Sequence, residues 1–171
     1  METTEKIVEA YVRYINHWAT IPNIKCPGQY EIDLLAIDPK SGKKYHIESG
    51  VSIATGFSKL TLQKFDPDLL KARLHKSKQR RTLGYFMEHK FSQPTVLATL
   101  KTYGFEPGKY QRVIVSWGWE PRVEAEASRQ NVLLWKFADV LSGIAEAFRA
   151  ERTYFTDDTL RTLQLYAMAS R

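Results

Sequence analysis

Three acidic residues lie at alternate positions of two neighbouring segments that are rich in strand-forming residues. Glu31 and Asp33 belong to the segment 30–37, and Glu48 belongs to the segment 43–52. Side chains alternate between the two faces of a strand, so a hairpin of these segments places Asp33 beside Glu48, about 5 Å away. Two carboxylates at that separation repel each other unless a cation lies between them.

Carboxylate oxygens of this kind suit Mg²⁺ or Mn²⁺. Such an ion polarises a phosphoryl oxygen and lowers the pKa of a bound water, which is the chemistry of phosphodiester hydrolysis. The alternative is that Glu31, Asp33 and Glu48 lie on a solvated face of the sheet, or pair with Lys44. His46 shares a face with Glu48, where it is a base, a metal ligand or a structural residue.

The positive charge of the chain is concentrated in one segment. The whole chain carries a net charge of +6, and residues 59–90, with nine basic and three acidic side chains, account for all of it. A cationic stripe of this kind is typical of surfaces that bind the phosphate backbone of nucleic acids, and the alternative is a solvated helix face. The basic residues expected to contact phosphates are Lys71, Arg73, Lys76, Lys78, Arg80 and Arg81.

The surrounding sequence predicts an α/β fold, with a central mixed sheet flanked by helices. One domain is expected over residues 1–171, with a C-terminal helix from about 157. Pro22 and the Cys-Pro-Gly stretch at 26–28 predict a loop after the first helix. Hydrophobic periodicity predicts helices over 4–19, 68–90, 94–104, 122–130, 136–151 and 157–169, and strands over 30–37, 43–52, 110–117 and 131–135.

The predicted hairpin resembles the core motif of the PD-(D/E)XK nucleases, more narrowly their restriction-endonuclease-like and Holliday-junction-resolvase-like members. Residues 28–36 read Gly-Gln-Tyr-Glu-Ile-Asp-Leu-Leu-Ala, and after a turn residues 46–52 read His-Ile-Glu-Ser-Gly-Val-Ser. The resemblance implies a restriction-endonuclease-like core and a Mg²⁺- or Mn²⁺-dependent DNA endonuclease. It also implies that Asp33 and Glu48 bind the metal and that Glu31 assists them.

One residue departs from the family's pattern, because Gly50 stands where the family has a lysine. In the family, that lysine positions the attacking water and steadies the developing charge. Three interpretations follow from the resemblance. Another lysine takes over the role, with Lys64 as the first candidate and Lys44 as the second. Otherwise the metal alone suffices, or the chain is a catalytically inactive nucleic-acid-binding subunit of an assembly.

A further glutamate often completes the metal site from the first helix of resolvase-like members. Glu9 lies on the first predicted helix, but almost opposite the apolar stripe formed by Ile7, Tyr11 and Trp18. It is therefore expected to face solvent.

Composition narrows the class of protein. The chain has 171 residues, 43% of them apolar, without an apolar run that could cross a membrane and without a secretory signal at the N-terminus. Its single cysteine excludes an internal disulfide framework and a cysteine-based zinc cluster. We therefore expect a cytoplasmic protein with DNA and no membrane as its partner. A homodimer is expected where both strands of a duplex are cut.

Overall fold

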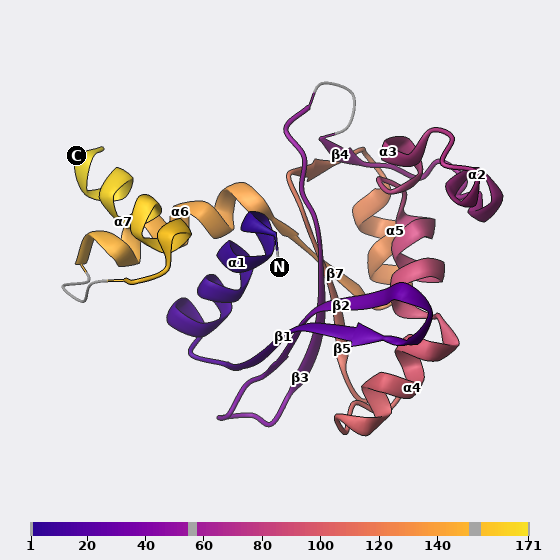
Figure 1. Cartoon of the computed structure of the whole chain (residues 1–171), viewed down its shortest axis with the longest axis horizontal. Helices are drawn as coiled ribbons and strands as arrows, with labels where there is room; N and C mark the ends of the chain where they lie inside the picture. The colour runs from indigo at the N-terminus through magenta and orange to yellow at the C-terminus, as the bar shows by residue number, and fades with distance from the viewer. Residues whose placement is uncertain (1, 55–57, 151–154, 171) are drawn as a thin grey trace.

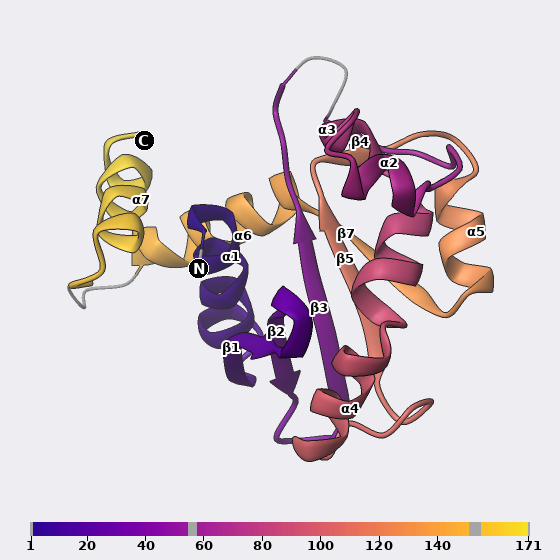
Figure 2. The same cartoon turned by 45° about the vertical axis from the view of Figure 1, so that its right-hand side comes forward.

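A five-stranded mixed sheet forms the centre of the computed structural model, which describes residues 2–54, 58–150 and 155–170. Helices cover both of its faces (Figures 1 and 2), which confirms the predicted fold class. The strand order is β1-β2-β3-β5-β7, and the first three strands are antiparallel neighbours whereas β5 and β7 run parallel to β3. The strands are β1 (Ala19–Cys26), β2 (Tyr30–Ile37), β3 (Lys44–Gly50), β5 (Gln111–Ser116) and β7 (Val132–Lys136), and a separate parallel pair joins β4 (Lys59–Leu60) to β6 (Gly118–Trp119).

One face of the sheet is covered by helices from the two ends of the chain. Ile47, Val113 and Val115 point into this layer and form one apolar core with side chains of the covering helices. Asp157 caps the last helix by accepting hydrogen bonds from the backbone of Thr159 and Leu160. The helices are α1 (Thr3–Ala10), its π-helical extension η1 (Tyr11–Ile15), α6 (Phe137–Ala150) and α7 (Asp158–Ala169).

The opposite face is covered by the middle of the chain. Ile114 points into this layer, where it packs with residues of the π-helical segment η3 and of α5, and Leu35 packs with α4. Side chains at alternate positions of a strand, and at paired positions of neighbouring strands, point to the same face of the sheet. Asp33, His46 and Glu48 therefore face the same layer as Leu35 and Ile114. The elements are α2 (Pro67–Lys71), α3 (Lys76–Gln79), η3 (Tyr85–Phe91), α4 (Pro94–Thr102) and α5 (Val123–Arg129).

The loop predicted after the first helix is wrong, because residues 19–26 form β1. β1 pairs with β2 in register from Ala19 opposite Ile37 to Cys26 opposite Tyr30. Pro22 had indicated a loop, but β1 is the edge strand of the sheet, where a missing backbone N–H is tolerated.

The single helix predicted over 68–90 is also wrong, because the structure divides it into α2, α3 and η3. Arg73 and His75 adopt left-handed backbone conformations with φ of 58° and 48°. Residues 81–83 pair instead with Thr61, the residue after β4, since the backbone N–H of Thr61 donates to the carbonyl of Arg81 (2.8 Å) and that of Leu83 donates to the carbonyl of Thr61 (2.9 Å). These bonds use backbone groups that a continuous helix would need.

Within the described parts of the chain, every helix is too short or too polar to cross a lipid bilayer.

Candidate functional site

The hairpin of β2 and β3 brings Asp33 and Glu48 together. Leu34 pairs with Ile47, so the next positions outward are Asp33 and Glu48. Both side chains are buried, with 6% of Asp33 and none of Glu48 exposed. The backbone fixes their orientation, because the N–H of Ser49 donates to Asp33 Oδ2 (2.8 Å) and the N–H of Asp33 donates to Glu48 Oε1 (3.4 Å).

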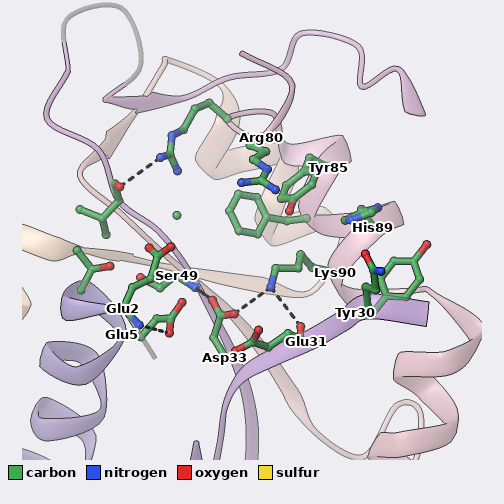
Figure 3. Close-up of a pocket in the computed structure, with 16 residues that line it drawn as sticks. Glu2, Glu5, Tyr30, Glu31, Asp33, Ser49, Arg80, Tyr85, His89 and Lys90 are labelled. Carbon is green, nitrogen blue, oxygen red and sulfur yellow. Dashed lines mark hydrogen bonds and ion pairs between the residues drawn. The ribbon is translucent and has the colours of Figure 1, made fainter. Parts of the chain in front are cut away.

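Lys90 reaches both carboxylates from η3, the helix above the hairpin. Its Nζ lies 2.9 Å from Asp33 Oδ1 and 2.5 Å from Glu48 Oε2, and it also donates to the backbone carbonyl of Glu31 (3.2 Å). Figure 3 shows the ammonium group next to Asp33 and Glu31. The two acids from adjacent strands therefore converge on one cation.

His46 holds the Glu48 carboxylate through a hydrogen bond from the same strand. Its Nε2 lies 2.7 Å from Glu48 Oε1, and the imidazole is fully buried, edge-on to Phe91 with ring centroids 4.8 Å apart. Burial, and to a lesser extent the charge of Lys90, lower the pKa of His46 to about 3. The imidazole is therefore neutral near pH 7 and donates its Nε2–H to the carboxylate, which makes His46 a structural support.

The three charged groups shift one another's pKa values. Burial raises the pKa of Asp33 to about 7, the charge of Glu48 acts in the same direction, and Lys90 opposes both. Burial also raises the pKa of Glu48. For Lys90, burial alone lowers the pKa, but the charges of Glu48 and Asp33 outweigh it and the net shift is upward. One ammonium thus serves two buried carboxylates, and the cluster takes up a proton as the pH falls towards 7 and below.

A cavity of about 290 Å³ opens above this cluster. Glu2, Glu5 and Glu31 lie with Asp33 on one side of it, and Arg80, Tyr85 and His89 lie on the other (Figure 3).

The sequence-predicted residues divide around this cavity. Glu31 lines it, but its carboxylate is paired with Lys25 of β1 at 2.5 Å, and its carbonyl is what contacts Lys90. Lys44 donates instead to the carbonyl of Gly104 (2.6 Å), and Lys64 is exposed and does not line the cavity. Of the six basic residues expected to contact phosphates, Arg80 and Arg81 line the cavity, and Lys71, Arg73, Lys76 and Lys78 are exposed outside it.

Sequence reasoning missed Lys90 and Glu5. The sequence carried no local signal for Lys90, because its place at the site depends on the packing of η3 on the sheet, where Phe86 lies beside Gly50 of β3. On α1, the acid that lines the cavity is Glu5, and its pKa is raised by burial and by the charge of Asp33. The expectation that Glu9 faces solvent is wrong, since Glu9 is 9% exposed and accepts a hydrogen bond from Thr20 Oγ1 (3.0 Å).

The carboxylate oxygens of the cluster are of the kind that binds a hard divalent ion, and the ammonium of Lys90 lies at the point on which they converge. Two carboxylates converge on one point, and Mg²⁺ is commonly bound through one or two carboxylates while it keeps several waters. Larger sets, with three or more His, Cys, Asp or Glu side chains arranged to hold a metal, do not occur in residues 2–54, 58–150 and 155–170. Asp33 and Glu48 are therefore the pair that would hold such an ion.

Comparisons with protein-family models, with curated proteins and with solved structures found no match for this chain.

Proposed function

We propose that this protein is a Mg²⁺- or Mn²⁺-dependent phosphodiesterase that hydrolyses DNA with a PD-(D/E)XK-like site. One observation carries the proposal. Asp33 and Glu48, on neighbouring strands, converge on the ammonium of Lys90, and of these three residues Asp33 and Lys90 line a polar cavity while Glu48 is fully buried. Buried carboxylates that share one position are costly to a fold unless they serve a ligand or an internal partner.

In this proposal the chain's own residues have separate roles. Asp33 and Glu48 hold the divalent ion, which when bound activates a water and polarises a phosphoryl oxygen. His46 keeps the Glu48 carboxylate in place through its Nε2–H. Lys90 supplies the positive charge that Gly50 lacks, and it steadies the negative charge that develops on the phosphoryl group.

The position of Lys90 also supports a second candidate function. Its ammonium group already lies between the two carboxylates and compensates their charge. A chain in which that arrangement is permanent would bind nucleic acid without cleaving it, as an inactive member of an assembly. The binding surface would then be the basic segment 59–90, with its charge of +6.

Plasmid nicking separates the two functions. We expect the wild-type protein to nick supercoiled DNA with Mg²⁺ or Mn²⁺ and not with EDTA. Glu48→Gln and Asp33→Ala should each lower the rate by more than about a hundredfold, because each removes a charged ligand of the ion. Glu106→Gln is the matched control, since Glu106 is an exposed carboxylate paired with Lys109. Wild-type protein that binds DNA but never cuts it with any divalent ion contradicts hydrolysis and supports the second candidate.

A further inference from the structure

Two arginines without a carboxylate partner line the cavity above the acidic pair. Arg80 and Arg81 both border the cavity, and Figure 3 shows Arg80 beside Tyr85, across from Asp33 and Glu31. In the described ranges of the chain, no ion pair involves either guanidinium, whereas Lys90 contacts two carboxylates. This wall therefore presents positive charge without a direct ion pair, although Glu2 on the opposite side of the cavity acts on Arg81 through its charge.

Arg81 is the less exposed of the two, and its hydrogen bonding is incomplete. Its Nη2 donates to the backbone carbonyl of Val51 (3.2 Å), but its Nε is buried without a partner. A buried guanidinium donor costs free energy unless something accepts its hydrogen bond. Because Arg81 also lines the open cavity, its guanidinium is placed to meet an anion that enters from the cavity side.

Gly50 makes the room that Arg81 occupies. A Cβ placed on Gly50 would lie 2.5 Å from Phe86 Cζ and 3.1 Å from Arg81 Nη1. The position where the resembled family carries a lysine is thus filled from η3 by Phe86 and from the preceding turn by Arg81. The absence of a side chain at Gly50 therefore leaves the space in which the guanidinium of Arg81 lies.

The backbone around Arg81 is fixed on both sides. Its carbonyl accepts from the N–H of Thr61 (2.8 Å), and the N–H of Leu83 donates back to the carbonyl of Thr61 (2.9 Å). Thr82 Oγ1 donates to the carbonyl of Gln79 (2.9 Å) and accepts from the N–H of Tyr85 (3.0 Å). A cation held in this way loses less conformational freedom when a ligand binds than a free surface side chain does.

We propose that Arg80 and Arg81 form a phosphate-binding subsite that takes a backbone phosphate of the nucleic-acid strand entering the cavity. The inference rests on the proposed function for the identity of the ligand as a phosphodiester. The planar guanidinium fork matches a phosphate through paired hydrogen bonds, which a lysine cannot reproduce. Arg73, Lys76 and Lys78 lie outside the cavity on exposed turns and on α3, where they add only a long-range field.

Equilibrium binding in EDTA tests the subsite without cleavage. Fluorescence anisotropy with a labelled single strand and with its duplex should show that Arg81→Ala weakens binding by about tenfold to a hundredfold, the value of one or two charge-assisted hydrogen bonds. Arg81→Lys should recover only a small part of this loss, because it keeps the charge but not the fork. Arg73→Ala is the matched control and should weaken binding less than about threefold.

Thermal unfolding of each variant identifies any loss of binding that comes from misfolding. If Arg81→Ala does not fold, Arg81→Lys still tests the subsite.

Several outcomes overturn the proposal. Equal losses for Arg81→Ala and Arg73→Ala would mean that the arginines act only through net charge, as would full recovery in Arg81→Lys. Binding of a polyglutamate peptide that competes with DNA at the same concentration and depends equally on Arg81 would mean that the subsite takes acidic proteins. The outcome is separable from hydrolysis, because cleavage with unchanged DNA affinity in Arg81→Ala rejects the subsite alone. Arg81-dependent binding without cleavage in any metal rejects hydrolysis alone.

Discussion

The two walls of the cavity carry charge in opposite ways. On the strand side, Asp33 lines the cavity and shares the ammonium of Lys90 with Glu48, which is fully buried and lies outside the cavity lining. On the side of the turn before η3, Arg80 and Arg81 have no carboxylate partner among the residues that the structure describes. Lys90 compensates part of the charge of the first wall, since one ammonium serves two carboxylates, whereas the arginines of the second wall have no ion-pair partner among the described residues.

Because of this difference, mutations on the two walls should affect different properties, folding stability on one and ligand binding on the other. Removal of one member of an internally paired cluster leaves a buried charge without a partner, so its main effect falls on folding stability. Removal of an unpaired cation relieves an unfavourable burial, so its main effect falls on ligand binding. Lys90 and Arg81, only nine residues apart in the chain, should therefore respond to mutation in different assays.

The largest effect is expected from Lys90→Met. The variant leaves Asp33 and Glu48 buried together without a cation, which should lower the free energy of unfolding by about 3–5 kcal/mol. Chemical denaturation in EDTA measures the loss. A divalent ion then becomes the one available counter-charge, so Mn²⁺ should raise the melting temperature of Lys90→Met more than that of the wild type.

The matched control for that variant is Lys109→Met. Lys109 pairs with Glu106 at 2.6 Å, but both side chains are more than half exposed. Loss of such a surface pair should cost less than about 1 kcal/mol. If the two lysine variants unfold at the same denaturant concentration, the strand-side wall is not an internally compensated cluster.

A smaller effect is expected from Gly50→Ala, which changes the boundary between the two walls. The added Cβ would lie 2.5 Å from the ring of buried Phe86, so the core must shift, at a cost of about 1–3 kcal/mol. Gly118→Ala is the control, because no atom outside its immediate neighbours lies within 4 Å of that Cβ position.

Gly50→Lys should be destabilised at least as much as Gly50→Ala and should not raise nicking activity. A stable and more active Gly50→Lys would show that Phe86 and Arg81 do not fill the place of the missing lysine and that Lys90 does not supply its charge.

The hairpin could be predicted from the sequence because the residues that form it are close together in the chain. Asp33 and Glu48 lie on strands joined by a short turn, so alternation alone places them on one face. The class of fold followed in the same way from the order of periodic segments. β1 was not predictable from propensity, because Pro22 is disfavoured in a strand unless that strand is at an edge, and the edge position is a property of the whole sheet.

The position of Lys90 in the site depends on contacts between residues that are distant in sequence. Lys90 is 57 residues from Asp33, and its arrival depends on where η3 packs on the sheet. Lys64 is closer to the hairpin in sequence, but it follows β4, which pairs with β6. The break that separates Arg81 from η3 likewise comes from pairing with Thr61, which local helix propensity does not encode.

The smallest effect concerns the pH dependence of stability. The pKa of Asp33 is about 7 in the fold against 3.8 when unperturbed, so between these values the folded protein holds a proton that the unfolded chain has lost. This group makes stability fall as the pH rises. The pKa of His46 is about 3 in the fold against 6.5, so between these values the unfolded chain holds the additional proton and stability rises with pH.

In the wild type these two slopes oppose each other between about pH 4 and pH 6.5, and Asp33→Asn removes only the first of them. The free energy of unfolding of Asp33→Asn should therefore gain about 1.4 kcal/mol relative to the wild type for each pH unit in that range. Urea denaturation at about pH 5 and about pH 6 measures the difference. Asp38→Asn is the control, because the pKa of that exposed carboxyl is lowered by hydrogen bonds from Ser41 and Lys40 rather than raised by burial, so its difference should not grow. Parallel curves for the wild type and Asp33→Asn would mean that Lys90 compensates Asp33 in full, and that the two walls differ less in their charge balance than the geometry indicates.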